Sequence, residues 1–179
     1  MQIVKWLDRP HRLARDGSGS ELDDIFFESS ATQSFASDAA RSDFRERWLG
    51  RYLRVYPEWV YVALSDEGAL TGYLLGCLDD PAQTPLFSDL GYFQELAALT
   101  ARFPGQLHVN LAAEARGAGV GGQLVSAFLR DARAAGCPGV HVVTGLGMRN
   151  VGFYERQRFR DQGHTTWNGS ALVFLAQPL

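Results

Sequence analysis

The sequence predicts an α/β protein in which one sheet carries helices on both faces, and three observations lead to that class. Short runs rich in β-branched, aromatic and other apolar residues alternate with stretches whose apolar residues recur at helical spacing. Glycine, proline and Asn-Gly signals separate these runs, and their mixed order argues for a layered α/β sheet. Of the 179 residues, 46% are hydrophobic and 21% are charged, a globular balance that fits one domain over residues 1–179.

The first half of the chain predicts a short strand, two helices and a hairpin. The expected ranges are an edge strand at 2–7, helices near 21–31 and 41–54, and hairpin strands at 59–64 and 70–78. In the second helix Phe44, Trp48 and Tyr52 recur at helical spacing, and Pro57 ends it. The polar segment 16–20 precedes the first helix, and residues 66–68 (DEG) supply the hairpin turn.

The second half predicts helices and strands in alternation. The expected ranges are a loop at 79–90, helices at 91–102, 121–135 and 148–157, and strands at 106–112, 139–144, 159–166 and 171–176. The helix at 121–135 is amphipathic, and its inward residues are expected to be Leu124, Phe128, Leu129 and Ala132. Gly136 and Pro138 end that helix, and Asn168-Gly169 joins the two closing strands in a tight turn.

Charge and cysteine content exclude several classes of protein. The chain has 17 Lys and Arg against 20 Asp and Glu, a net charge of −3, so we expect no nucleic acid as the main partner. Five arginines decorate the second helix and are interpreted as a solvated basic face: Arg41, Arg45, Arg47, Arg51 and Arg54. No apolar run is long enough to span a membrane, and the two cysteines form no disulfide framework, which favours a cytoplasmic location. The four histidines are scattered, so we expect no metal site.

The segment Arg116-Gly117-Ala118-Gly119-Val120-Gly121-Gly122 is the most informative for chemistry. It follows one predicted strand and opens the next helix, so its backbone N–H groups and the helix dipole suit a pyrophosphate. A Walker loop would need Lys and then Ser or Thr after Gly122, where Gln123 and Leu124 stand. A dinucleotide fold would need an acidic residue in the next strand, where 142–144 read VVT. A plain tight turn is the remaining alternative.

Together with a second motif, this segment resembles the GNAT acetyltransferases. Residues 116–121 match the family pattern Arg/Gln-x-x-Gly-x-Gly/Ala, and residues 152–156 (GFYER) with Phe159 are similar to its Phe-Tyr signature. Weaker likenesses point to bacterial members related to the acetyltransferase-like domain of O-GlcNAcases, and they lie at 51–53, 57–58, 72–73 and 78–79. The sequence departs from the family pattern at Gly147, where many relatives carry Asn, and at Arg158, where relatives often carry Gly.

The resemblance implies a fold and a co-substrate. The fold would be a mixed, mostly antiparallel central sheet with helices on both faces and a splayed fourth and fifth strand pair. Acetyl-CoA would lie between these two strands, with its pantetheine on the backbone of Leu111 and Ala113. Its pyrophosphate would bind Arg116, Gly117, Ala118, Gly119, Val120, Gly121 and Gly122. Asn150, which shares a helix face with Tyr154, is a further candidate for contact with the co-substrate.

The reaction that the resemblance implies is acetyl transfer by direct attack of a primary amine, carried by a small molecule or a protein. The N–H near Leu111 would polarise the thioester, and Tyr154 would protonate the departing thiolate, because a phenol is protonated at neutral pH. Packing of the helix on the sheet is the alternative role of Tyr154. A non-catalytic module that binds acetyl-CoA or another acyl-CoA is the competing function, and a different acyl donor is a third. A homodimer is left open.

The group that deprotonates the amine is also left open by the sequence. The candidates are His108 on the fourth strand and the carboxylates of Asp79, Asp80 and Glu95. Asn110 shares one strand face with His108; its amide cannot act as a base, but it can orient a water molecule or the substrate. A chain of water molecules would also serve. Cys77 and Cys137 lie in apolar stretches and are expected to be packing residues rather than nucleophiles.

Overall fold

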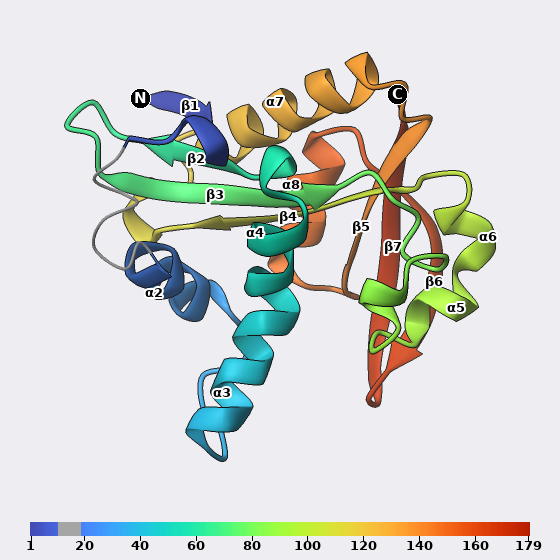
Figure 1. Cartoon of the computed structure of the whole chain (residues 1–179). Coiled ribbons are helices and arrows are strands. Elements are labelled where there is room, and N and C mark those ends of the chain that lie inside the picture. Colours follow the sequence, from blue (N-terminus) through green and yellow to red (C-terminus); the bar gives the residue numbers. More distant parts are fainter. Residues whose placement is uncertain (11–18) are drawn as a thin grey trace. The chain divides into compact units, whose positions relative to one another are not determined.

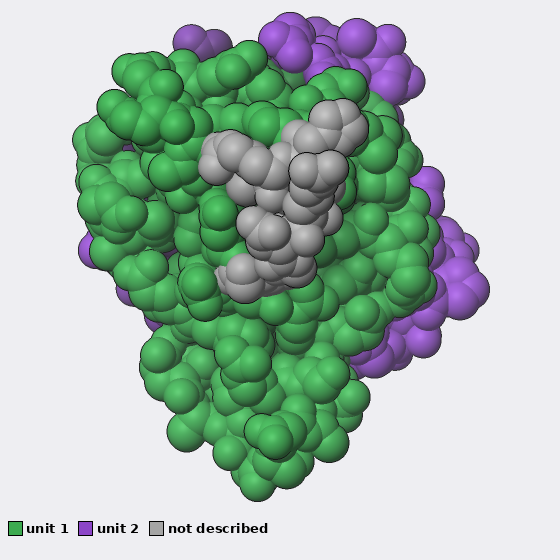
Figure 2. All heavy atoms as spheres, turned by 60° about the vertical axis from the view of Figure 1, so that its left-hand side comes forward, with its two compact units in different colours: residues 1–76, 108–128 green, residues 77–107, 129–179 purple. Residues whose placement is uncertain are grey.

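The computed structural model describes residues 1–10 and 19–179, which form two compact units. Unit 1 comprises residues 1–76 and 108–128, and unit 2 comprises residues 77–107 and 129–179 (Figure 2). Strand β4 (Gly105–Leu111) and helix α7 (Val120–Ala134) contribute residues to both units. The single domain over residues 1–179 stays a prediction. Of the polar segment 16–20, residues 16–18 lie outside the described residues.

The strands form a seven-stranded, mostly antiparallel sheet in the order β1-β2-β3-β4-β5-β7-β6 (Figure 1). Besides β4, the strands are β1 (Gln2–Lys5), β2 (Tyr61–Leu64), β3 (Leu70–Cys77), β5 (Gly139–Gly145), β6 (Arg160–Trp167) and β7 (Ser170–Pro178). Strand β4 runs parallel to β5, with the register Gly105↔Val140 and Gln106↔His141 at the start of both strands. The predicted mixed α/β fold is confirmed, whereas the splaying of β4 and β5 stays a prediction.

The helices of unit 1 begin with α2 (Gly19–Ser29), followed by a helical run over residues 38–55. That run comprises α3 (Asp38–Arg45), a π-helical segment (Glu46–Gly50) and α4 (Arg51–Val55). It begins three residues before the predicted start because the Ser37 hydroxyl caps it, accepting a hydrogen bond from the Ala40 N–H at 3.1 Å. After α4, Pro57 opens a 3₁₀ turn (Pro57–Trp59) that leads into β2.

The prediction of a solvated basic face on this run is wrong for Arg51. Arg51 is buried, with 6% of its surface exposed. The Arg45 Nε donates to Asp23 Oδ1 at 2.7 Å, and the Arg54 guanidinium pairs with Glu46. Arg45 is partly buried in its ion pair, whereas Arg54 stays exposed. The burial of Arg51 depends on tertiary contacts, which the periodicity of the run does not report.

Unit 1 has helices on both faces of its strands. In the register of β2 with β3, Tyr61 lies opposite Leu74 and Val62 lies opposite Tyr73, so Tyr61 and Tyr73 point to opposite faces. The Tyr61 ring packs edge-on against Phe128 of α7 at 6.3 Å between centroids. On the other face, Tyr52 of α4 contacts His108 of β4, with ring centroids 5.6 Å apart. One face is thus covered by α7 and the other by α4.

Unit 2 is built on β5, β7 and β6, with the remaining helices around them. These helices are α5 (Tyr92–Glu95), α6 (Ala97–Thr100) and α8 (Arg149–Arg156). The helix predicted over 91–102 is therefore two short helices, because the backbone of Leu96 leaves the helical region at ψ 10°. Helix α5 packs on β6, where the ring centroids of Tyr92 and Trp167 lie 5.7 Å apart. The predicted turn at Asn168-Gly169 is confirmed, since both residues have positive φ angles of 49° and 79°.

Helices α7 and α8 end in the same hydrogen-bonded motif, but with different residues at its critical position. After α7, the Gly136 N–H bonds to Arg133 O and the Cys137 N–H to Ala132 O, with Gly136 at φ 78°. After α8, the Arg158 N–H bonds to Glu155 O and the Phe159 N–H to Tyr154 O, with Arg158 at φ 71°. Arg158 therefore adopts a left-handed conformation that carries a steric cost for any residue with a Cβ.

We expect Arg158→Gly to raise the free energy of unfolding by about 0.5–1 kcal/mol, because glycine accepts the left-handed conformation without the Cβ clash. Urea denaturation measures this change. Arg158→Ala is the matched control, since it removes the exposed guanidinium but keeps the Cβ, and it should give no gain. Equal stabilisation by both variants would contradict backbone strain as the cause.

Candidate functional site

The glycine-rich segment lies in unit 1, between a 3₁₀ turn (Ala113–Ala115) and the first turn of α7. Gly117 and Gly119 have φ angles of 83° and 82°, which explains the choice of glycine at both positions. A Cβ added at either residue would meet no atom within 4 Å, so this side of the segment is open. The Gln123 N–H bonds to Gly119 O at 3.2 Å, which makes Gly119 the residue that caps α7. The N–H groups of the first helical turn that follow it lack intrahelical acceptors and suit an anion.

Close packing of β3 against the end of β4 positions this segment. A Cβ on Gly72 would lie 2.9 Å from Asn110 O and would also collide with the Leu111 side chain. The Ala112 N–H donates to Thr71 O at 3.1 Å, directly after the last residue of β4. The backbone of Leu111 and Ala113, where the family resemblance implies the pantetheine, is therefore held in place from β3.

The Arg116 side chain turns away from the glycines and back onto β4. Its Nε and Nη2 donate to Leu111 O at 3.1 and 3.0 Å, and Nη2 lies 3.7 Å from Glu28 Oε1 of α2. The guanidinium thus occupies one of the two backbone acceptors that the sequence assigns to the pantetheine. The structure therefore gives the Arg116 side chain a contact that the motif did not reveal.

Two side chains on one face of β4 each bind a tyrosine hydroxyl. His108 Nε2 lies 3.2 Å from the Tyr52 hydroxyl, and Asn110 Nδ2 donates to the Tyr73 hydroxyl at 2.7 Å. Both tyrosines are fully buried, whereas His108 and Asn110 are only partly buried. The ring of Trp48, from the π-helical segment, stands edge-on to His108 at 5.8 Å between centroids.

The electrostatics of this face favour uncharged side chains. Burial and, to a smaller extent, the positive charge of Arg51 together lower the pKa of His108 to about 4. Burial also raises the pKa of Tyr73, so this phenol stays neutral. His108 is therefore a neutral imidazole at pH 7, able to donate from one nitrogen and accept at the other.

Sequence reasoning missed Tyr73 as a member of this face, because it lies within an apolar strand. The spacing of Trp48 and Tyr52 indicates core residues under a helix, with an aromatic pocket as the alternative, and it does not report their contacts with His108. The i, i+2 spacing of His108 and Asn110 was the available signal, because it places both on one face of a strand. Their partners lie 56 and 37 residues away in the chain, a separation that local patterns do not report.

Unit 2 holds the other predicted site residues. Tyr154 is buried on α8, and its ring packs edge-on against Phe153 and Phe159 with centroids 5.0 and 5.6 Å away. Asn150 is exposed at the start of α8 and donates from Nδ2 to Thr144 Oγ1 of β5 at 2.9 Å. The aromatic contacts of Tyr154 agree with its alternative role in packing. The hydrogen bond of Asn150 links the start of α8 to β5.

Most of the candidate carboxylates and thiols of unit 2 have hydrogen-bond partners within that unit. Asp80 Oδ1 accepts from the Ala82 N–H at 2.9 Å, the pattern of a turn residue, and Glu95 accepts from the Thr165 hydroxyl. Asp79 is exposed. Burial raises the pKa of the Cys77 thiol to about 12, and the buried Cys137 thiol donates to Gly139 O at 3.2 Å. Both thiols fit the expected packing role better than that of a nucleophile.

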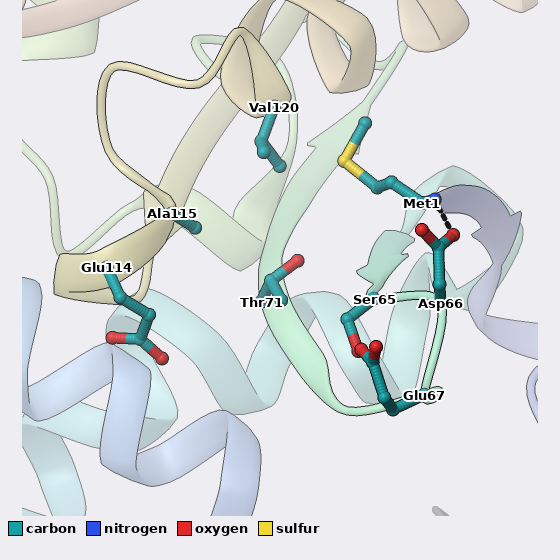
Figure 3. A pocket seen from close by; sticks show the side chains of 8 residues that line it. All are labelled: Met1, Ser65, Asp66, Glu67, Thr71, Glu114, Ala115 and Val120. Atoms are coloured by element: carbon teal, nitrogen blue, oxygen red, sulfur yellow. Dashed lines mark hydrogen bonds and ion pairs between the residues drawn. The ribbon is translucent and has the colours of Figure 1, made fainter.

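A hollow of about 250 Å³ lies next to the glycine-rich segment in unit 1 (Figure 3). It is lined by Met1, Ser65, Asp66, Glu67, Thr71, Glu114, Ala115 and Val120. The Met1 ammonium pairs with Asp66, and Glu67 accepts from the Ser65 hydroxyl at 2.8 Å. With three carboxylates around it, this hollow disfavours a phosphate.

Within residues 1–10 and 19–179, no helix is long and apolar enough to cross a membrane. Over the same ranges, no three His, Cys, Asp or Glu side chains are grouped so that they could hold a metal ion.

Comparison with known proteins gives a family match and many structural likenesses. A model of the acetyltransferase (GNAT) family matches residues 31–159. The crystal structure of SsHAT is similar over 99% of this chain and 97% of its own, with a TM-score of 0.74 and 19% identity. The NatC complex bound to Gag peptide and CoA matches over 100% of this chain and 99% of its own, with a TM-score of 0.64 and 14% identity.

A third solved structure, ribosomal-protein-alanine N-acetyltransferase from Brucella melitensis, matches over 100% of both chains, with a TM-score of 0.58 and 20% identity. At these identities the likenesses support the fold alone. Comparison with curated protein sequences gave no significant match.

The lowered pKa of His108 predicts a pH dependence of stability. Its folded-state pKa of about 4 lies below the ordinary value of 6.5, so the unfolded chain binds more protons between these values. The contribution of neutral His108 is therefore present above pH 6.5 and is lost as the pH falls toward 4. We expect the stability difference between the wild type and His108→Asn to shrink over this range by on the order of 1–3 kcal/mol. Urea denaturation at a series of pH values measures it, and parallel curves for the two proteins would refute it.

Proposed function

Because the chain belongs to the acetyltransferase (GNAT) family, we propose that it transfers the acetyl group of acetyl-CoA to a primary amine. The observation that carries this proposal is the glycine-rich segment, whose open glycines and helix start offer backbone donors to a pyrophosphate. The solved NatC complex, similar in fold, is bound to CoA, which supports the same co-substrate for this chain.

In the proposed complex, the N–H groups from Arg116 to Gly122 hold the pyrophosphate, and the backbone of Leu111 and Ala113 holds the pantetheine. The open side of Gly117 and Gly119 supports this placement, because a phosphate there would meet backbone rather than side chains. If the pantetheine bonds to Leu111 O, Arg116 must leave that oxygen. Its guanidinium is then available to the negative charge of the co-substrate.

In the proposed reaction, the amine nitrogen attacks the thioester carbonyl while an N–H near Leu111 polarises the carbonyl oxygen. Tyr154 gives its phenolic proton to the departing thiolate. The family resemblance supports this role of Tyr154. Its packing between Phe153 and Phe159 supports the competing function, a module that binds acyl-CoA without catalysis.

Three finer assignments complete the proposal. We propose that the chain belongs to the subgroup related to the acetyltransferase-like domain of O-GlcNAcases, on the likenesses at 51–53 and 57–58. We propose a cytoplasmic location, on the low cysteine content. The acceptor is proposed to be an amine of a small molecule or a protein, with no nucleic acid as partner, on the net charge of −3.

We expect Gly119→Ala to weaken acetyl-CoA binding by about tenfold or more, because a Cβ strains the positive φ and intrudes on the phosphate side. Calorimetric titration with acetyl-CoA, CoA and dephospho-CoA measures it. Gly169→Ala is the matched control, since it places a Cβ at φ 79° in the exposed turn between β6 and β7. Equal affinities in the wild type and both variants, or no binding to the wild type, would reject the segment as the pyrophosphate site.

We expect Tyr154→Phe to lower kcat by about 10²-fold while acetyl-CoA affinity stays within about twofold, because the variant keeps the packing but removes the proton. Steady-state release of CoA in the presence of a broad amine panel measures kcat. Unchanged turnover, with chemistry shown to be rate-limiting by single-turnover kinetics, would assign Tyr154 to packing alone. A wild type that binds acetyl-CoA but releases no CoA with any amine would favour the non-catalytic module.

A further inference from the structure

The face of β4 that carries His108 and Asn110 holds polar groups that the proposed reaction has not used. Asn110 gives one N–H to Tyr73, which leaves its Oδ1 as an acceptor, and His108 Nε2 engages Tyr52, which leaves Nδ1. Neither remaining atom has a hydrogen-bond partner within residues 1–10 and 19–179. Neither is among the described buried polar atoms that lack a partner, and both side chains are only partly buried.

This pair of atoms is held rigidly. Each of the two β4 side chains is fixed by a tyrosine with no exposed surface, Tyr52 from α4 and Tyr73 from β3. The side chains are two residues apart on one strand, and the strand continues to Leu111, where the thioester is proposed to lie. A ligand on this face would therefore meet two fixed polar atoms and the partly exposed ring of Trp48.

The charges around the face disfavour a bound cation. Arg51 is positive and acts on His108, whose pKa is lowered to about 4 by burial first and by that charge second. Asp23, the carboxylate that acts on Tyr73, is paired with Arg45 at 2.7 Å. An ammonium group at this face would suffer the same desolvation and the same repulsion that keep the imidazole neutral.

We propose that this surface, the acceptor face (Trp48, Tyr52, Tyr73, His108 and Asn110), binds a primary amine that is uncharged at neutral pH, such as an arylamine, in preference to an alkylammonium. The inference rests on the proposed function. A neutral amine offers two N–H donors and one lone pair. Asn110 Oδ1 and His108 Nδ1 accept the two N–H groups when His108 Nε2–H donates to Tyr52, and the lone pair stays free for the thioester. An ammonium has a third N–H and no lone pair.

The proton balance of the step suits such an amine. The N–C bond forms, the C–S bond breaks, and the acetylated nitrogen loses one proton to His108 Nδ1 and from there to water. Tyr154 protonates the sulfur and is reprotonated by water, so the products are an N-aryl acetamide and CoA. A weak base such as neutral His108 takes a proton efficiently only from an acidic nitrogen, which is what attack by a weakly basic amine produces.

The test compares 4-methylaniline with 4-methylbenzylamine, two primary amines of similar size that differ in basicity. For each amine, kcat/KM at pH 7 is divided by the rate constant of its uncatalysed reaction with acetyl-CoA. We expect this ratio to be at least about tenfold higher for 4-methylaniline. A ratio equal for both amines, or higher for 4-methylbenzylamine, would overturn the inference.

Asn110→Asp supplies a second, independent readout. The new carboxylate would accept a hydrogen bond from the Tyr73 hydroxyl, in place of the bond that Asn110 Nδ2 now donates to it. It would also pair with an ammonium group, so we expect the preference to shift toward 4-methylbenzylamine by at least about tenfold. Asn168→Asp is the matched control, because it makes the same charge change in the exposed turn between β6 and β7 and should leave the preference unchanged. Equal shifts of the amine preference in the two variants would overturn the proposed role of the acceptor face.

Failure of this inference is distinguishable from failure of the proposed function. Calorimetry with acetyl-CoA and thermal melting report whether each protein is folded and binds the co-substrate. CoA release with 4-methylbenzylamine alone would reject the acceptor class and leave the acetyltransferase standing. Binding of acetyl-CoA without release by either amine would overturn the acceptor face, and the broad amine panel would then decide catalysis itself.

Discussion

The absence of a side chain at Gly72 is the constraint on which the site in unit 1 depends. It lets β3 approach the end of β4 so closely that a Cβ would lie 2.9 Å from Asn110 O. The hydrogen bond from the Ala112 N–H to Thr71 O follows from that approach. It fixes where the strand ends and the glycine-rich segment begins. On the same stretch of β4, Asn110 reaches Tyr73 of the neighbouring strand, so one close contact supports both the glycine-rich segment and the proposed acceptor face.

The two compact units contribute different chemistry. Unit 1 supplies the backbone donors of the glycine-rich segment and the neutral polar pair on β4. Unit 2 supplies Tyr154 and Asn150, both on α8. In unit 1 the polar groups are fixed by buried tyrosines, whereas in unit 2 Tyr154 is fixed by aromatic packing and by the helix end at Arg158. The position of the proposed acid, Tyr154, therefore depends in part on the strained backbone of Arg158.

The sequence predicts the elements of this fold well because their signals are local. Residues that favour a positive φ mark the backbone turns within a few positions of the sequence. Examples are the turn at 66–68, the glycine after α7 and the Asn-Gly turn after β6. The glycine-rich segment is equally local, so the expected donors at the start of α7 stand where the motif placed them. Leu129 is less buried than its periodicity predicts, and Val125 takes its place in the core.

The side-chain partners of the site could not be predicted in the same way. The contact of Tyr52 with His108 joins an α-helix to a strand 56 residues later, and the burial of Arg51 depends on the same fold. The π-helical segment that presents Trp48 has no signal in a period of 3.6 residues. The return of Arg116 to Leu111 O is also invisible in a motif that specifies only residue types.

That return makes Arg116 an internal competitor of any ligand that uses Leu111 O. Such a ligand replaces the two hydrogen bonds that the Arg116 guanidinium donates to this oxygen, so its contact with Leu111 O adds little to the net affinity. The Leu111 carbonyl has a hydrogen-bond donor both with and without the ligand, which lowers the barrier to ligand exchange. A ligand that is bound tightly and released slowly would instead require a carbonyl without an internal donor. A carbonyl that always has a donor would suit the release of the spent co-substrate in each cycle of the proposed reaction.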